Sequence, residues 1–506
     1  MEPTFRASMN WLHTWAGVVL GGILFAVFWM GTLSVFDREI DRWMKPATRL
    51  APIEVDSIDA VARELRPLTD GAQQWSILLP TEREPVVRIG YRKPGQAFQG
   101  REVDPSTAAL LPDAGTWAGT RFIYPFHYML HLRFADIGFW FVGLAAMAML
   151  AMCVSGVVIH RKIFADFFTF RVDRKPRRLV LDLHNLAGVL GLPFHFVITL
   201  SGLFIFFTIY FAGVRDVAFR SDRASFNHEA YGIHSRPKDG RPAERAASID
   251  AMLAEASKLW GGAQPYFVRV WHPGDANAYV EVRRSYADAV TMNLDLAYFD
   301  AASGALLHSA SAKPVMTAQR FLAGLHFIQF DHWTLRWLYF AAGLVGCVVI
   351  ATGYLFWLES RRRKHAQLGL NGVRVVEGLT IGSVSGLVIA TLMFLVVNRL
   401  LPLGTAFLGQ DRAALEIWTF YLAWLATFAH AWARSGGAWR EQCWIIATLA
   451  LAAVLSNWLT TGDHLGRSLW RRHLWPVAGM DTMLFVGSAA AALAASRLGR
   501  RRVVPV

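Results

Sequence analysis

Histidines flank an apolar segment in the first third of the chain, and their imidazoles are side chains that can ligate a metal or carry a proton. His127 and His131 come just before the apolar run 137–159, and His160 follows it directly. The 29 positions between His131 and His160 span roughly 43 Å of helix, so these side chains are predicted at opposite membrane faces. A histidine at membrane depth is costly to leave unpaired and usually faces the bundle interior.

A duplication gives some of these histidines equivalents. The segments LHTWAGVVLGGILFAVFWMGTL from Leu12 and LHNLAGVLGLPFHFVITLSGLF from Leu183 resemble each other, which indicates a repeat. The alignment pairs His13 with His184, Gly17 with Gly188, and Gly31 with Gly202.

A second histidine pair follows from the same repeat. The segments RFIYPFHYMLH from Arg121 and RFLAGLH from Arg320 align less closely. His326 matches His127 by ungapped spacing, or His131 by the shared Leu-His.

The paired histidines predict a cofactor. An iron porphyrin between two helices, ligated by one imidazole from each, would satisfy both histidines and fill an apolar slot. His13 with His184 predicts a site near the cytoplasmic face, and His131 or His127 with His326 predicts one near the external face. The simpler alternative is that these are interfacial polar residues and that the nearby glycines serve close packing.

Two further histidines allow several interpretations. His195 lies 11 residues beyond His184 on the same predicted helix. It is interpreted as a third ligand, as a hydrogen-bond donor behind a ligand, or as part of a proton path. His160 could replace His13 or His184 as a ligand near the cytoplasmic face.

The whole chain has the composition of a membrane protein. Of its 506 residues, 54% are hydrophobic, so a soluble protein is excluded. The three cysteines have no paired spacing, which gives no indication of a disulfide framework. Eight apolar segments are long enough to be read as spans: 15–36, 137–159, 186–211, 333–357, 378–401, 417–433, 443–459 and 477–496.

The distribution of Lys and Arg predicts the orientation. Basic residues follow the second span in 161–178, the fourth span in ESRRRK, and the last span in SRLGRRRVV. Both termini are therefore expected in the cytoplasm and the two long connections outside. The net charge of +13 reflects this asymmetry and calls for no nucleic acid, whereas membrane lipid is an expected partner.

The two long connections also repeat each other. SIDAVARELRP from Ser57 and SIDAMLAEASK from Ser248 each predict a Ser-capped amphipathic helix, and alternating strands follow both. The predicted organisation is a first span in 1–36, an α+β module in 37–120, the second span, cytoplasmic loop and third span in 121–213, a second module in 214–319, the fourth span in 320–364, and four additional spans in 373–497.

The ordered motifs FHYMLHLRF, GVVIHRKIFADFFTFR, LDLHNLAGVLGLPFHFVITLSGL and LRWLYFAAGLVGCVVIATGYLFW resemble the PepSY-associated transmembrane helix family across about 1–364. The resemblance implies an all-α membrane bundle of about eight helices, with a pseudo-two-fold four-helix core and two α+β periplasmic PepSY-like modules. Family members include bacterial inner-membrane ferric-siderophore reductases with b-type haems. The resemblance makes His13, His131, His184 and His326 the expected axial ligands of two b haems, and His127, His160 and His195 also match family positions.

The expected function is electron transfer across the bacterial inner membrane to a ferric siderophore in the periplasm, as a ferric-siderophore reductase. No residue is assigned as catalytic; Arg133 and Arg336 are expected to dock the anionic chelate. No G-x-G-x-x-G follows a predicted strand, so the donor is expected to be an unidentified quinol or cytoplasmic reductase. The alternative is a non-redox membrane protein whose modules bind a peptide or regulate a peptidase. A transporter is a third hypothesis.

Overall fold

The computed structural model describes residues 4–160, 176–434 and 436–500. The chain forms two compact units: a helical unit of 1–46, 115–200 and 333–506, and a sheet-bearing unit of 47–114 and 201–332. The predicted module boundaries at residues 37 and 120 therefore differ from those of the compact units, because Asp37–Met44 and the residues from Gly115 onward lie with the helices. The basic loop that predicted the orientation lies largely in 161–175, outside the described residues.

The helical unit consists of long helices joined by short ones. The long helices are α1 (Phe5–Ser34), α6 (Ile137–Ile159), α8 (Pro176–Ile205), α14 (Trp333–Gln367), α15 (Gly372–Leu400), α16 (Arg412–Ala433), α17 (Ala438–Thr461) and α19 (Trp475–Arg500). The short elements are α2 (Asp37–Met44), the π-helix η2 (Ala118–Ile123), α5 (Tyr124–Met129), η3 (Phe134–Asp136), the strand pair β8 (Ala406–Phe407) and β9 (Gln410–Asp411), α18 (Leu465–Trp470) and η4 (Arg472–Leu474).

Within the described residues, seven helices are long and apolar enough to cross a membrane. They include every predicted span except 417–433, which lies in the α-helix α16 but outside those seven. Helix α16 begins at a side-chain cap, since the Asp411 carboxylate accepts a hydrogen bond from the Ala414 amide.

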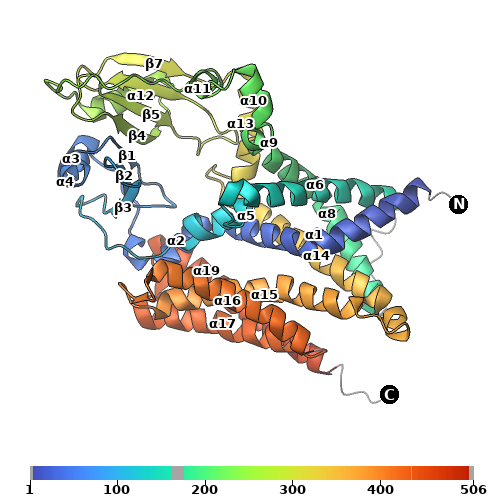
Figure 1. The fold of residues 1–506 in the computed structure, drawn as a ribbon. Helices are drawn as coiled ribbons and strands as arrows, with labels where there is room; N and C mark the ends of the chain where they lie inside the picture. The colour runs from blue at the N-terminus through green and yellow to red at the C-terminus, as the bar shows by residue number, and fades with distance from the viewer. Residues whose placement is uncertain (1–3, 161–175, 435, 501–506) are drawn as a thin grey trace. The chain divides into compact units, whose positions relative to one another are not determined.

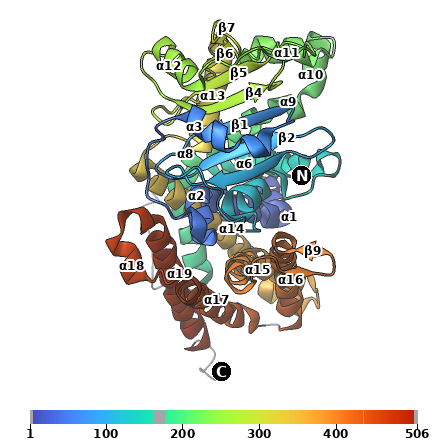
Figure 2. The same cartoon turned by 90° about the vertical axis from the view of Figure 1, so that its left-hand side faces the viewer.

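The last helices share their core with the first span. Helix α15 is central, because 78% of its most apolar window is buried, and it packs against α14, α16 and α17. Phe25 and Met30 of α1 belong to the same buried cluster as Phe394 of α15 and Phe420 of α16. Figure 2 views α15, α16, α17 and α19 nearly end-on and shows them gathered together.

The sheet-bearing unit contains one antiparallel sheet with the strand order β3-β2-β1-β4-β5-β6-β7. Its strands are β1 (Gln74–Leu78), β2 (Val87–Arg92), β3 (Gln99–Val103), β4 (Pro265–Trp271), β5 (Tyr279–Arg284), β6 (Leu296–Asp300) and β7 (Leu306–Ala310). Its helices are α3 (Ile58–Glu64), α4 (Arg66–Thr69), α9 (Phe207–Tyr210), α10 (Ala212–Ala218), α11 (Arg223–Tyr231), α12 (Ile249–Leu259) and α13 (Pro314–Phe327) (Figure 1).

The strand order is mirrored about the pairing of β1 with β4, which come from different copies of the repeat. The first strands of the two copies, β1 and β4, pair antiparallel, with Ile77 opposite Val268. The outer strands then follow in the same succession on each side, up to β3 and β6. Beyond β3, a single bridge between Val103 and Leu110 takes the place that β7 occupies beside β6. The two predicted modules thus build one continuous sheet.

Helices α3 and α12 cover the sheet and cap each other. The Asp250 carboxylate accepts hydrogen bonds from Ser57 Oγ at 2.6 Å and from the Ile58 amide at 2.7 Å. The Asp59 carboxylate accepts the equivalent bonds from Ser248 Oγ at 2.5 Å and from the Ile249 amide at 2.9 Å. Each carboxylate therefore satisfies backbone donors at the start of the other copy's helix.

Candidate functional site

The imidazoles of His13 and His184 are held in the same way by equivalent helices. His13 on α1 places Nδ1 3.2 Å from the Met152 carbonyl oxygen and 3.1 Å from Ser155 Oγ, both on α6. The equivalent contacts of His184 on α8 run to α14, where Nδ1 lies 3.0 Å from the Val349 carbonyl oxygen and 3.3 Å from Thr352 Oγ1.

These contacts fix the tautomer of both rings. A carbonyl oxygen only accepts hydrogen bonds, so Nδ1 of each imidazole carries the proton and Nε2 carries the lone pair. Among the described residues, no hydrogen bond reaches Nε2 of His13 or His184. A ring that donates from one nitrogen to a backbone carbonyl and keeps the other nitrogen unprotonated has the arrangement of a metal ligand.

The two rings are also spaced for shared ligation. Their centroids lie 6.3 Å apart, with ring planes at 88°. Two imidazoles that bind one metal from opposite sides have centroids about 6 to 7 Å apart, because each metal–nitrogen bond is about 2 Å long. Across the described residues, no group of three or more His, Cys, Asp or Glu side chains could hold a metal ion. Two imidazoles from different helices are one set of protein ligands that iron in a haem takes.

A cavity of about 270 Å³ lies between α1, α6, α8 and α14 and is lined by both imidazoles. Gly17 and Gly188, one turn from each histidine, also line it. A Cβ at Gly188 would have no heavy atom within 4 Å, and one at Gly17 would meet only Met152 Sδ at 3.5 Å. The repeat-related glycines thus leave open space beside the ligand candidates, which fits a flat group between the helices.

His160 and His195 line the same cavity in different ways. His160 ends α6, four residues after Gly156, against which the His13 ring lies. His195 is 2% exposed, and its Nε2 lies 3.2 Å from the Ala342 carbonyl oxygen. Its ring also contacts Phe28 at 5.5 Å. Since Nε2 of His195 is engaged, this histidine does not repeat the arrangement of His13 and His184.

The structure distinguishes the two alignments of His326. The His127 ring lies against Gly31, where a Cβ would come within 2.7 Å of the imidazole. The His326 ring lies against Gly202, where the same distance is 2.9 Å. Because Gly31 and Gly202 are equivalent in the repeat, the structure pairs His326 with His127. His127 belongs to the helical unit and His326 to the sheet-bearing unit.

His131 has a different environment from the other candidates. Its Nε2 donates to the Phe122 carbonyl oxygen at 2.8 Å, and its ring stacks on Phe122 with a centroid distance of 4.8 Å. The residue has a positive φ of 54° in the turn after α5. With Nε2 donating to a carbonyl, Nδ1 of His131 carries the lone pair, so His131 would ligate a metal through the opposite nitrogen from His13 and His184.

The two arginines expected to dock a chelate differ in exposure. Arg133 is exposed, and its Cζ lies 6.0 Å from the Trp117 ring centroid. Arg336 is 2% exposed and donates to the Val35 carbonyl oxygen at 3.3 Å. The burial of Arg336 corrects the expectation that it meets a substrate, because its guanidinium is engaged inside the helical unit.

Sequence reasoning missed the hydrogen-bond partners of the two ligand candidates. Ser155 and Thr352 precede Gly156 and Gly353, and the segments MCVSG and VIATG occupy equivalent places in the two copies. This weak match between the two copies is the sequence feature that could have indicated a shared role for Ser155 and Thr352. Arg361, which also lines the cavity, had no such signal.

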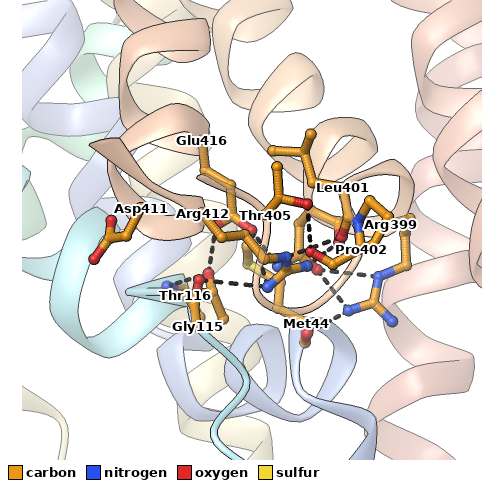
Figure 3. A network of polar contacts seen from close by, with 12 residues as sticks. Met44, Gly115, Thr116, Arg399, Leu401, Pro402, Thr405, Asp411, Arg412 and Glu416 are labelled. Atoms are coloured by element: carbon orange, nitrogen blue, oxygen red, sulfur yellow. Dashed lines mark hydrogen bonds and ion pairs between the residues drawn. The ribbon is translucent and has the colours of Figure 1, made fainter. Parts of the chain in front are cut away.

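The last helices contain a buried polar network (Figure 3). Glu416 is 0% exposed and accepts hydrogen bonds from Thr116 at 2.5 Å and Asn398 at 2.9 Å, with Arg412 at 3.3 Å. Arg399 binds the Met44 carbonyl oxygen and lies over the Trp43 ring. The network joins α15 and α16 to α2 and to the residues before η2, and the Glu416 carboxylate pairs with the Arg412 guanidinium within it.

These observations define a class: a multi-pass helical membrane protein with an internal duplication and a paired-histidine cavity. The chain belongs to the PepSY-associated TM region family, whose model matches residues 10–360. It is similar to "Uncharacterized protein PA4219" of Pseudomonas aeruginosa, with 31% identity over 277 residues, covering 52% of this chain and 68% of that protein.

Proposed function

We propose that the protein is a b-type dihaem electron-transfer protein of the bacterial inner membrane that reduces ferric-siderophore iron in the periplasm. The observation that carries the proposal is the repeated arrangement of His13 and His184 around one cavity, with both Nδ1 atoms occupied and the ring centroids 6.3 Å apart. Haem bound there supplies a one-electron couple.

The side chains around the cavity have defined tasks in this proposal. Ser155 and Thr352 help to fix the ring orientation of His13 and His184, and the backbone carbonyls keep both imidazoles in the ligating tautomer. Apolar residues of the four helices exclude water from the rings. The hydrogen bonds of His13 and His184 are therefore stronger, because a hydrogen bond gains electrostatic strength in an environment of low dielectric constant.

A second haem, with His326 and either His131 or His127 as its ligands, is proposed from the repeat in the sequence. Each within its own unit, the His127 ring lies against Gly31 and the His326 ring lies against the equivalent Gly202. Nδ1 of His127 donates to the Val27 carbonyl oxygen at 2.8 Å, which holds this imidazole in the same tautomer as the first pair. His326 is held through Ser201 Oγ, 3.2 Å from its Nδ1.

The acceptor is proposed from the predicted topology and from iron chemistry. Both termini are expected in the cytoplasm, so the sheet-bearing unit faces the periplasm. One electron reduces ferric to ferrous iron, which a hard-oxygen chelator holds less tightly. Exposed Arg133 remains a candidate contact for the anionic chelate. The donor is a quinol or a cytoplasmic reductase.

Haem content tests the ligand assignment. His184→Ala and His326→Ala are each expected to lower haem per protein by about one, and the double variant nearly to zero, because each removes one ligand of a different pair. His308→Ala, in the sheet-bearing unit, is the control and should retain full haem. Full haem with unchanged spectra in both single variants would contradict the assignment.

Reoxidation tests the reaction. Protein in nanodiscs is reduced with dithionite, freed of excess reductant and mixed with a ferric siderophore in the presence of a ferrous-specific dye. Loss of the reduced Soret band should accompany dye formation, and Arg133→Ala should slow both without changing haem content. Reduced haem that survives for minutes with several classes of ferric siderophore would overturn the reductase proposal.

The competing proposal is a non-redox protein that binds peptides. The observation in its favour is the sheet, whose edge strands β3 and β7 offer backbone groups to an added strand. A colourless protein after haem-supplemented expression would favour this alternative.

A further inference from the structure

Among the described residues that line the cavity, one, Arg361, carries a fixed charge. Arg361 lies on α14, eight residues after Gly353, against which the His184 ring packs. Its Cζ lies 4.7 Å from the centroid of Trp357, one turn earlier on the helix. The side chain therefore folds back toward the histidines, as long side chains in helices do. Among the described residues that line the cavity, none is Asp or Glu.

Arg361 lacks the anionic partner that its neighbour has. Arg362 lies 3.1 Å from Glu377 and 3.7 Å from Glu359. Within the described part of the chain, Arg361 makes no hydrogen bond or ion pair, and its contact with the Trp357 ring is its one charge-specific interaction. A partly buried guanidinium costs free energy unless an anion accompanies it.

Further donors lie at the same end of the cavity. Trp357 is 6% exposed, and its buried Nε1 has no hydrogen-bond partner among the described residues. Asn10 and Asn185 line the cavity beside the two ligand candidates. Among the described residues, the indole N–H and the guanidinium together form a donor set without an acceptor.

The two copies of the repeat differ in sequence at this end of the cavity. Trp357 stands four residues after Gly353, where the first copy has His160 four residues after Gly156. Among the described residues, one side of the cavity thus presents an indole and a guanidinium, and the other presents an imidazole. A ligand with acidic groups on one edge would therefore be held in one orientation.

We propose that Arg361, supported by Trp357, binds the carboxylate side chains of the haem held by His13 and His184. This inference rests on the proposed function and names the residues that orient the cofactor. The same anion-binding chemistry could serve a phospholipid phosphate, and the experiment separates the two sources.

The test compares ferric haem with its dimethyl ester, which lacks the two negative charges. Both are titrated into the haem-free full-length protein in nanodiscs and followed at the Soret band. Wild type should bind haem about tenfold more tightly than the ester, because a charge-assisted hydrogen bond is lost with the ester. Arg361→Gln should lower haem affinity about tenfold and leave ester affinity unchanged. Arg363→Gln, on the exposed side of the same helix end, is the control and should behave as wild type.

Each other outcome overturns the inference. Equal wild-type affinity for haem and ester means that no carboxylate is recognised. If Arg361→Gln lowers the affinities for haem and for the ester equally, the arginine is only structural. If both affinities stay at their wild-type values, so that the preference for haem is unchanged, Arg361 serves a lipid phosphate instead. Loss of the bis-imidazole Soret signature in His184→Ala, with no such loss in Arg361→Gln, would show that the haem-ligand assignment of the proposed function holds even if this inference fails.

Discussion

At the scale of single residues, the histidines differ in which ring nitrogen makes a hydrogen bond to a backbone carbonyl. His13 and His184 use Nδ1 for backbone carbonyls and keep Nε2 for a ligand, whereas His131 and His195 have Nε2 engaged by carbonyl oxygens. The sequence shows that the histidines repeat, but it does not show which nitrogen faces a carbonyl, because that depends on a neighbouring helix.

The open space at Gly188 leads to a prediction. Gly188→Ala should leave apoprotein stability unchanged or raise it by up to about 1 kcal/mol, since alanine favours a helix and the added Cβ meets nothing within 4 Å. Haem content should nevertheless fall, because the methyl group takes space proposed for the macrocycle. Gly487→Ala, equally open on α19, is the control. Full haem content in Gly188→Ala, measured by the pyridine haemochrome, would count against the cavity as the haem site.

The Asp300 carboxylate gives a prediction about pH. Burial alone would raise its pKa, but hydrogen bonds from Arg236 and Ser303 lower the pKa from the ordinary 3.8 to about 2. A lowered pKa stabilises the fold above the unfolded-state value, and this contribution is lost as pH falls from about 4 toward 2. Wild type should therefore exceed Asp300→Asn in thermal stability at pH 6, and the difference should shrink toward pH 2.

The control for this measurement is Asp288→Asn, whose side chain is 61% exposed. Thermal unfolding followed by tryptophan fluorescence at several pH values gives the comparison. A stability difference between wild type and Asp300→Asn that stays constant down to pH 2 would contradict the assignment.

At the scale of elements, the two copies complete each other. Strands β1 and β4 pair, and helices α3 and α12 exchange caps through Asp59 and Asp250. The repeated SIDA motifs predict both helices and their serine caps. They do not predict the exchange, because a cap is ordinarily satisfied within its own helix.

The exchanged caps should be coupled. Asp59→Ala and Asp250→Ala should each cost about 1 kcal/mol of stability. Their double variant should cost less than the sum by about 0.5 kcal/mol or more, because breaking one cap loosens the helix pair that the other needs. Asp222→Ala, which removes the local cap of α11, is the control and should add fully to Asp59→Ala. Strict additivity of Asp59→Ala with Asp250→Ala in chemical denaturation would show that the caps act independently.

At the scale of the whole molecule, the terminal helices are part of the main core. Sequence reasoning set them aside as an additional region without assignable chemistry. The structure joins α15 and α16 to α1 and α2 through the shared apolar cluster and the Glu416 network. Such contacts between distant segments leave no local pattern, since Thr116 and Glu416 are ordinary residues in their own neighbourhoods.

Loss of the central carboxylate should be severe. Glu416→Ala leaves Arg412 and Asn398 buried without their partner, and we expect a cost of about 3 to 5 kcal/mol. Glu377→Ala, which breaks a partly exposed pair with Arg362, should cost about 1 kcal/mol or less. Thermal unfolding in detergent measures both, and similar melting temperatures for the two variants would contradict the structural role of the network.

The mirrored strand order of the sheet has a historical consequence. Before the two copies were joined in one chain, a single-copy ancestor would have exposed the β1 edge and an uncapped pair of helix N-termini. Association of two such chains would have supplied both, with each Asp capping the partner's helix. Each copy therefore supplies the strand edge and the helix caps that the other copy needs. Outside this exchange the copies differ, since Trp357 stands in one where His160 stands in the other.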